Sequence, residues 1–243
     1  MAITTTTVDY RDGATLLEGY LAAPSGKTPA PAVLIAHMWG GRVEFVCEQA
    51  RQLAELGYTA FALDMYGKGP DGAILGRDPQ DNARLMRPLV DNRRLLQQRI
   101  LAAYKALRAR PETDPGRIAA IGYCFGGLCA LDLARTGAAL RGVVSIHGLL
   151  EPPPQPERGH IKCKVLLLHG HDDPSADLPS LLALQQELTA MRADWQCVLY
   201  GHTQHAFTNP AANNPAAGTV YNETADRRSR QALLNFLEEI LGS

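Results

Sequence analysis

The stretch "RIAAIGYCFGG" (residues 117–127) places a cysteine where an apolar run meets a glycine-rich segment. Residues 117–123 have the continuous apolar character of a fully buried strand, and we expect a helix over 125–136. Three glycines within residues 122–127 weaken either kind of element. That cost favours a tight turn in which larger side chains do not fit, with Cys124 at the junction of strand and helix.

Such a turn is typical of a nucleophile elbow, where the reactive side chain stands exposed above the sheet. Gly122 and Gly126 lie two residues before and after Cys124, so the spacing matches G-x-S-x-G with cysteine in place of serine. A helix N-terminus lowers the pKa of a thiol, and the N–H of Phe125 would face an oxyanion formed beside Cys124. The alternatives are a buried structural cysteine and a dinucleotide-binding turn, although the G-x-G-x-x-G spacing of the latter is not matched.

Strand-like and helix-like segments alternate along the rest of the chain. "RDG" predicts a hairpin turn between strands at 4–10 and 15–22. Further strands are expected at 31–37, 58–64, 117–123, 142–147, 164–170 and 195–200, helices at 43–57, 89–109, 125–136, 178–191 and 222–241, and long loops at 65–82 and 151–160. This order predicts a mostly parallel central sheet with helices on both faces and an N-terminal antiparallel hairpin. With no long linker, we expect a single domain over residues 1–243.

Composition limits the classes of function. The chain has 243 residues, 46% of them apolar and 20% charged, with a formal net charge of -1. A nearly neutral chain without a basic run gives no ground for binding nucleic acid or a membrane surface. Its five cysteines form no CxxC pair, no apolar run approaches about 18 residues, and the first residues lack the features of a signal peptide. We expect a cytoplasmic protein, monomeric or homodimeric, without a cofactor or metal.

An elbow thiol needs a base, and the base needs an orienting acid. In α/β hydrolases the order along the chain is nucleophile, acid, histidine. "LLLHGHDDP" supplies Asp172 and Asp173 after one strand, and "YGHTQHAF" supplies His202 and His205 after the next. Because sites form beyond the carboxyl ends of parallel strands, these groups are expected on one rim with Cys124. We favour Asp173, which precedes a proline, and His205, which precedes Ala-Phe; Asp172 stays open as the acid.

Two other functions remain as alternatives. "HGHDDP" resembles the H-x-H-x-D-H zinc signature, which would make His169, His171 and Asp173 ligands of a metal-dependent hydrolase, although Pro174 stands where the last histidine belongs. The second alternative is a non-catalytic ligand-binding protein of the same fold. His147, His160 and His169 are otherwise expected to be structural.

From about residue 15 to 240 the chain resembles the dienelactone hydrolase family of α/β hydrolases. The similar features are "GYCFGG", "HGHDDP", "GHTQHAFTNP" and "LAELGYTAFALDMYGKG". The resemblance implies an α/β-hydrolase fold, Cys124 as nucleophile, His205 as base and Asp173 as its partner. It also implies an oxyanion hole formed by the N–H groups of Phe125 and Met38.

The implied activity is hydrolysis of a carboxylic ester or lactone through a thioester acyl-enzyme, related to carboxymethylenebutenolidase. Two positions depart from the family's pattern. His37 stands where family members carry the glutamate that handles the thiol's proton, and Asn209 lies near the position of an arginine that grips a substrate carboxylate. The candidates for the wall of a substrate pocket are His37, Trp39, Tyr66, Arg84, Arg87 and Phe207.

Overall fold

The structure is a computed structural model that describes residues 1–26, 29–76, 78–153 and 161–242. Its centre is an eight-stranded sheet with the strand order β1-β2-β4-β3-β5-β6-β7-β8. The strands are β1 (Ile3–Asp12), β2 (Thr15–Pro24), β3 (Ala30–Ala36), β4 (Thr59–Ala62), β5 (Thr113–Tyr123), β6 (Gly142–Ile146), β7 (Lys164–Gly170) and β8 (Trp195–Tyr200). β1 and β2 form an antiparallel hairpin, β2 pairs antiparallel with β4, and the other neighbours are parallel.

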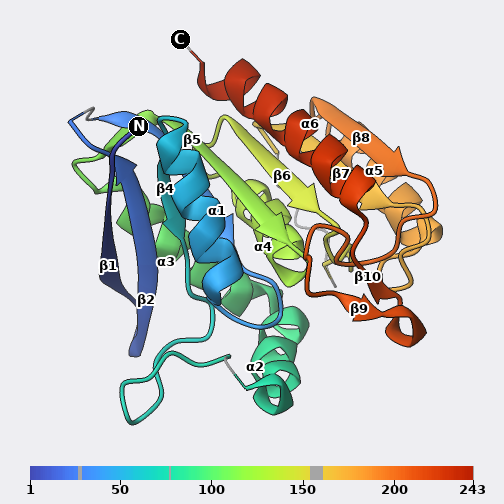
Figure 1. Ribbon diagram of the computed structural model, residues 1–243, viewed down its shortest axis with the longest axis horizontal. Helices are drawn as coiled ribbons and strands as arrows, with labels where there is room; N and C mark the ends of the chain where they lie inside the picture. Colours follow the sequence, from blue (N-terminus) through green and yellow to red (C-terminus); the bar gives the residue numbers. More distant parts are fainter. Residues whose placement is uncertain (27–28, 77, 154–160, 243) are drawn as a thin grey trace.

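Helices cover both faces of this sheet (Figure 1). They are α1 (Glu44–Glu55), α2 (Pro79–Asp91), α3 (Arg93–Arg108), α4 (Phe125–Arg135), α5 (Leu178–Ala190) and α6 (Glu223–Leu241). One apolar cluster joins the sheet to α1 and α6, and a second joins its opposite face to α3, α4 and α5. The mostly parallel sheet with helices on both faces and the N-terminal hairpin are therefore as predicted.

The apolar runs form the middle of the sheet because their side chains are buried on both of its faces. Every residue of β4 and β6 is buried, as is the second half of β5. Such strands cannot alternate apolar and polar residues, since neither face meets water. Their carboxyl ends come together at one edge of the sheet, and the loops that leave this edge carry the candidate site residues.

The helices predicted between β4 and β5 were wrong in number and in bounds. Residues 65–82 were expected to form a loop and 89–109 a single helix, but α2 begins at Pro79 and a break at Asn92 separates it from α3. The Asp78 side chain caps α2 by accepting from the N–H of Gln80, and the Asn92 side chain caps α3 by accepting from Leu95. Pro88 lies inside α2, where the sequence offers little sign of a helix.

Three short elements follow β8 and were not predicted. They are β9 (Asn213–Asn214), the 3₁₀ turn η1 (Pro215–Ala217) and β10 (Thr219–Val220), and β9 pairs antiparallel with β10. Most of the predicted loop at 151–160, including His160, lies outside the described residues. Across the described ranges, none of the helices combines the length and the apolar character that crossing a bilayer requires.

Candidate active site

Cys124 occupies the sharp turn between β5 and α4. Its backbone has φ 56° and ψ -119°, a strained conformation for any residue other than glycine. The flanking glycines are required by close approach: a Cβ on Gly122 would stand 1.8 Å from the carbonyl oxygen of Gly126, and one on Gly126 would stand 2.2 Å from that of Ala36. The turn therefore has the geometry that the glycine spacing predicts, and the Cys124 side chain remains partly exposed.

Asp173 and His205 meet at the same edge of the sheet. Asp173 follows β7 and His205 follows β8, and the two side chains are 3% and 4% exposed. The His205 Nδ1–H donates to Asp173 Oδ2 at 2.8 Å. The other carboxylate oxygen accepts from the N–H of Ser175 at 2.8 Å, which fixes the plane of the carboxylate. This arrangement leaves Nε2 of the imidazole free to face another group.

That group is the sulfur of Cys124, whose thiolate and the His205 imidazolium stabilise each other. Burial by itself raises the pKa of the thiol, but the charge of His205, its hydrogen bond and two backbone N–H groups hold the pKa below its usual value. Burial lowers the pKa of His205, but the nearby thiolate and Asp173 raise it to about 10. At neutral pH these directions favour a thiolate–imidazolium ion pair.

The two amides that act on the sulfur belong to Phe125 and Trp39. Phe125 opens α4, so its N–H is among those that a helix leaves without an internal partner. Trp39 lies in the loop after β3, one residue beyond Met38, the predicted second oxyanion donor. Met38 is buried in the same loop, and its donor role stays a prediction. The Trp39 amide was missed because no side-chain pattern shows which peptide of a loop turns inward.

A small supporting unit ties the acid and base loops together. The His205 N–H donates to Gly218 O at 2.9 Å, and the Val220 N–H donates back to His205 O at 3.1 Å. Gly218 packs directly on the loop of the acid, because a Cβ there would stand 2.1 Å from Cγ of Pro174. The segment 213–220 thus supports both Asp173 and His205. No periodic pattern marks this segment, which shows only a cluster of Asn, Pro and Gly.

The other members of each predicted pair point elsewhere. Asp172 is exposed, and its carboxylate bonds His171 Nδ1 at 2.7 Å. His202 is exposed and has a positive φ of 54°. The geometry therefore favours Asp173 and His205, as the sequence argument did.

The alternative metal ligands do not converge. His169 is buried, and its Nε2 donates to the carbonyl of Ala176 at 2.8 Å. His171, two residues further along the chain, faces solvent. The Asp173 carboxylate accepts the hydrogen bond from His205. Among the residues that the structure describes, no three His, Cys, Asp or Glu side chains are grouped so as to hold a metal ion.

His147 lies beside the candidate triad of Cys124, His205 and Asp173. Its ring centroid is 5.2 Å from that of His205, at an interplanar angle of 68°. Its Nε2 lies 2.9 Å from the hydroxyl of Thr208, whereas Nδ1 is buried without a hydrogen-bond partner. Burial and the charge of His205 lower the pKa of His147 well below its usual value. The imidazole of His147 is therefore neutral.

The aromatic candidates for the pocket wall differ in position. Trp39 is 43% exposed beside the Cys124 loop. Tyr66 is buried, stacks on Phe125 at 6.1 Å and donates its hydroxyl to Trp39 O at 2.7 Å. Phe207 is fully buried and packs against His147 and Tyr200, so its side chain is part of the core below the site.

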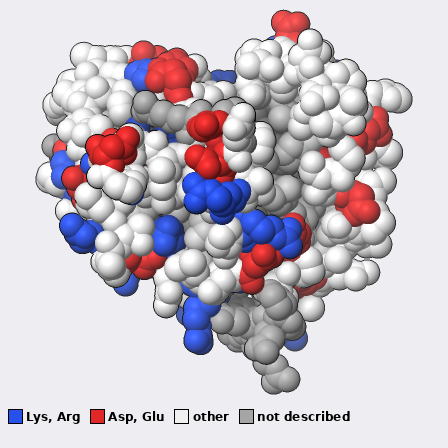
Figure 2. Space-filling view, turned by 90° about the horizontal axis from the view of Figure 1, so that it is seen from below, with Lys and Arg blue, Asp and Glu red and all other residues white. Residues whose placement is uncertain are grey.

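The arginine candidates lie on α2. Arg84 pairs with Asp81 at 3.0 Å and Arg87 pairs with Asp91 at 2.8 Å, and both guanidinium groups are largely exposed. Figure 2 shows basic and acidic side chains interspersed over the face of the molecule seen from below. Because each arginine is satisfied by an acid on its own helix, neither is assigned to a substrate.

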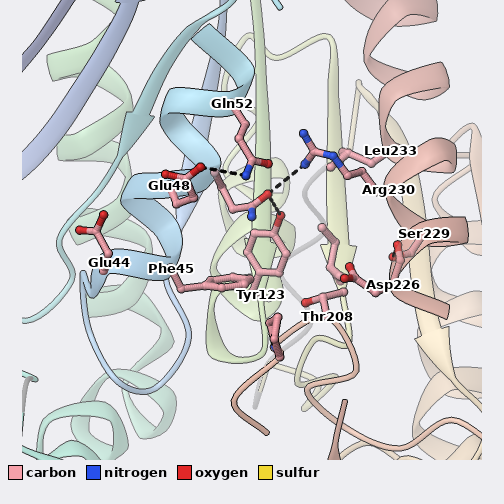
Figure 3. Close-up of a pocket in the computed structure, with 13 residues that line it drawn as sticks. Glu44, Phe45, Glu48, Gln52, Tyr123, Thr208, Asp226, Ser229, Arg230 and Leu233 are labelled. Atoms are coloured by element: carbon pink, nitrogen blue, oxygen red, sulfur yellow. Dashed lines mark hydrogen bonds between the residues drawn. The ribbon is translucent and has the colours of Figure 1, made fainter. Parts of the chain in front are cut away.

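A separate cavity of about 480 Å³ lies between α1 and α6 (Figure 3). Tyr123 lines the cavity and donates its hydroxyl to Gln49 at 3.3 Å, and Arg230 donates to the same oxygen at 3.2 Å. Thr208, the partner of His147, also lines this cavity, whereas the candidate triad does not. Thr208 is therefore shared between the lining of this cavity and the surroundings of His147.

Comparisons with known proteins agree with this architecture. The model of the dienelactone hydrolase family matches residues 17–241. A crystal structure of P91, a dienelactone hydrolase-like promiscuous phosphotriesterase from metagenomic libraries, is 37% identical, covers 100% of both chains and superposes with a TM-score of 0.93. The uncharacterized protein K02A2.1 of Caenorhabditis elegans is 34% identical over 59% of this chain and 93% of its own. Carboxymethylenebutenolidase of Pseudomonas putida is 27% identical over 83% of this chain and 85% of its own. With the family model matching nearly the whole chain, the protein belongs to the dienelactone hydrolase family.

Proposed function

We propose that the protein hydrolyses carboxylic esters or lactones through a covalent thioester on Cys124. The observation that carries the proposal is the line of contacts from Asp173 through His205 to the sulfur. Support also comes from the relatives whose names state such activity, among them a probable 2-oxo-3-(5-oxofuran-2-ylidene)propanoate lactonase of Bradyrhizobium, 25% identical over 92% of this chain.

In the first half of the reaction the thiolate attacks the carbonyl carbon, and a C–S bond forms while the carbonyl π electrons move to oxygen. Backbone N–H groups beside the sulfur stabilise this oxyanion; donors of this kind are worth about 3 kcal/mol each. The C–O bond to the alcohol then breaks, and the imidazolium of His205 gives its proton to the leaving oxygen. The product is a thioester and a neutral imidazole.

In the second half, neutral His205 takes a proton from water, and the hydroxide adds to the thioester carbonyl. The second tetrahedral intermediate expels the thiolate and releases the carboxylic acid, which restores the ion pair. Throughout, Asp173 keeps the proton on Nδ1 and balances the charge of the imidazolium. Because a thiolate leaves more readily than an alkoxide, the first intermediate reverts when the alcohol leaves poorly. We therefore expect aryl esters and enol lactones to be better substrates than alkyl esters or amides.

The test uses p-nitrophenyl acetate with purified wild type, Cys124→Ala and Cys129→Ala. Cys129 is the matched control, because it is a fully buried cysteine one turn further along the same helix, and burial raises the pKa of its thiol. We expect Cys124→Ala to lose at least about 10³-fold in kcat/KM and Cys129→Ala to stay within about threefold. Mass spectrometry of quenched wild type should find one acyl group on the peptide that contains Cys124.

Equal activity in Cys124→Ala and wild type would refute the role of Cys124. A wild type that binds esters and lactones without turning any of them over would favour the ligand-binding alternative.

A second candidate activity is hydrolysis of phosphotriesters, favoured by the full-length similarity to the promiscuous phosphotriesterase. Here the thiolate would attack phosphorus, an S–P bond would form, and an aryloxide would leave with the proton of His205. Water activated by His205 would then release the phosphodiester. Turnover of paraoxon that Cys124→Ala abolishes supports this activity, and a single stoichiometric burst without turnover contradicts it.

A further inference from the structure

His37 stands two residues before Trp39 in the loop after β3, and it was predicted as a candidate for the wall of the substrate pocket. Its side chain is fully buried between Tyr66 and Phe125, with ring centroids 4.8 and 6.1 Å away. Both ring nitrogens have backbone partners. The N–H of Met65 donates to Nε2 at 3.1 Å, and Nδ1 lies 2.6 Å from the carbonyl oxygen of Met38.

These two contacts fix the protonation state of the ring. Because Met65 offers a hydrogen, Nε2 must accept it and therefore carries none of its own. The carbonyl of Met38 can only accept, so Nδ1 carries the proton and donates it. His37 is thus a neutral imidazole, and burial lowers its pKa in the same sense, opposed by the charge of Asp64 and aided by that of Arg42. With both nitrogens engaged, His37 has no free site for the proton of Cys124.

The carbonyl that His37 binds belongs to the same peptide unit as the N–H of Trp39, and it also accepts a longer bond, of 3.2 Å, from the N–H of Gly41. A peptide unit is planar and its C=O and N–H point in opposite directions, so holding one end sets the other. The N–H end of this unit contributes to lowering the pKa of the Cys124 thiol. The next unit is held in the same way, since the Tyr66 hydroxyl donates to Trp39 O at 2.7 Å.

The loop has little freedom to compensate on the side of α4. A Cβ on Gly126 would stand 2.2 Å from Ala36 O and 2.8 Å from His37 O, so the first turn of α4 packs on the backbone of this loop. Resting on the proposed function of Cys124, we propose that His37 is a positioning residue that holds the Met38–Trp39 peptide with its N–H facing the sulfur. The histidine therefore acts on the nucleophile through the backbone, without exchanging a proton with it.

The proposal separates two substitutions of similar size. Asparagine places an amide nitrogen at the distance of Nδ1 from the backbone, so His37→Asn keeps a donor for Met38 O and loses the acceptor for Met65. Glutamine places its oxygen near the position of Nε2, so His37→Gln keeps the acceptor and loses the donor at Nδ1. A purely structural role would make both variants alike, since each loses one hydrogen bond.

The readout is the pH dependence of iodoacetamide alkylation at Cys124, followed by peptide mass spectrometry, because only the thiolate reacts. His205 is the charged group that faces the sulfur and is unchanged in all variants. We expect His37→Gln and His37→Leu to raise the pKa of Cys124 by about one unit, which slows alkylation about tenfold at pH values below that pKa. His37→Asn should stay within about threefold of wild type. Equal profiles for the Asn and Gln variants would overturn the proposal.

A measurement on wild type covers the case in which the variants fail to fold. In a protein labelled with ¹⁵N, the imidazole of His37 should carry its proton on Nδ1 and show no titration between pH 5.5 and 9. A proton on Nε2, or titration near the ordinary pKa of histidine, would overturn the proposal. Neither readout depends on ester hydrolysis, so the loss of the proposed function in Cys124→Ala and the loss of this positioning role are seen separately.

Discussion

Two buried histidines in contact with each other, His205 and His147, have pKa values that are shifted in opposite directions. Their side chains are 4% and 0% exposed, and their ring centroids are 5.2 Å apart. The pKa of His205 is raised to about 10, whereas that of His147 is lowered well below its usual value. Burial favours the neutral form of both rings. The difference comes from the partners: His205 has a carboxylate and a thiolate, and His147 has a hydroxyl.

The comparison shows that two neighbouring imidazoles at the same edge of the sheet differ in pKa, so that His205 is charged and His147 is neutral at neutral pH. Burial is the main reason why the pKa of His147 is lowered, and the charge of His205 lowers it further by disfavouring a second positive charge. If the ion pair is lost, the two rings should become more alike. The tests below try to remove the difference or to measure it.

The largest effect is expected from Asp173→Asn, which replaces the charged acceptor of His205 Nδ1–H with a neutral amide. The pKa of His205 should fall toward that of His147, and the imidazole should lose its fixed tautomer. For other triads such a change costs about 10⁴-fold in kcat, and we expect a loss of about 10³ to 10⁴-fold in aryl ester hydrolysis.

The control is Asp172→Asn, which changes the neighbouring exposed carboxylate that bonds His171. Its kcat/KM should stay within about threefold of wild type, as for most surface substitutions. A larger loss in Asp172→Asn than in Asp173→Asn would exchange the two roles.

A second test follows the charge difference itself over pH. Because the thiol pKa is lowered and the imidazole pKa is raised to about 10, the ion pair exists between those two values. The kcat/KM should therefore fall in acid as the thiolate gains a proton, and fall again above about pH 10 as His205 loses the proton needed by the leaving group. Imidazole NMR signals should show His205 titrating near pH 10 and His147 neutral from pH 5 to 9. Titration of both rings near pH 6.5 would contradict the ion pair.

The smallest effect is expected from Thr208→Val, which removes the hydroxyl that bonds His147 Nε2. Losing one neutral hydrogen bond should lower the free energy of unfolding by about 1 kcal/mol. For a chain of this size that corresponds to a fall of about 2–4 °C in Tm. Since His147 exchanges no proton with the substrate in the proposed reaction, kcat/KM should stay within about threefold. A loss of activity beyond tenfold with an unchanged Tm would assign Thr208 to the reaction.

Much of this site was predictable from the sequence because its constraints are local. The apolar runs identify strands buried on both faces, and the glycines at 122 and 126 mark a turn where backbone atoms approach closely. A carboxylate and a histidine after the next two strands then fall at the same edge of a parallel sheet. Short-range patterns and the sheet topology were enough to predict that Cys124, Asp173 and His205 lie near one another.

The parts that were not predicted depend on individual side-chain and backbone contacts that no periodic pattern shows. The short elements at 213–220 contact Pro174 in the loop after β7 and His205 in the loop after β8, and no sequence pattern indicates these contacts. The break at Asn92 depends on a side-chain cap that competes with a continuous helix. The Met38 and Trp39 carbonyls on either side of the Trp39 residue accept hydrogen bonds from His37, Gly41 and Tyr66, and the sequence shows none of these contacts.

The close packing of Gly218 on Pro174 has a mechanical consequence. The loops that carry Asp173 and His205 form one packed unit, because the segment 213–220 contacts both of them. The cysteine belongs to another unit, where α4 is pressed onto the backbone after β3. We therefore expect a relative shift of the two units to change the distance from the His205 imidazole to the Cys124 sulfur more than the distance from Asp173 to His205. Substitutions that shift these units, although remote from all three side chains, should therefore change the reactivity of the Cys124 thiol through this one distance.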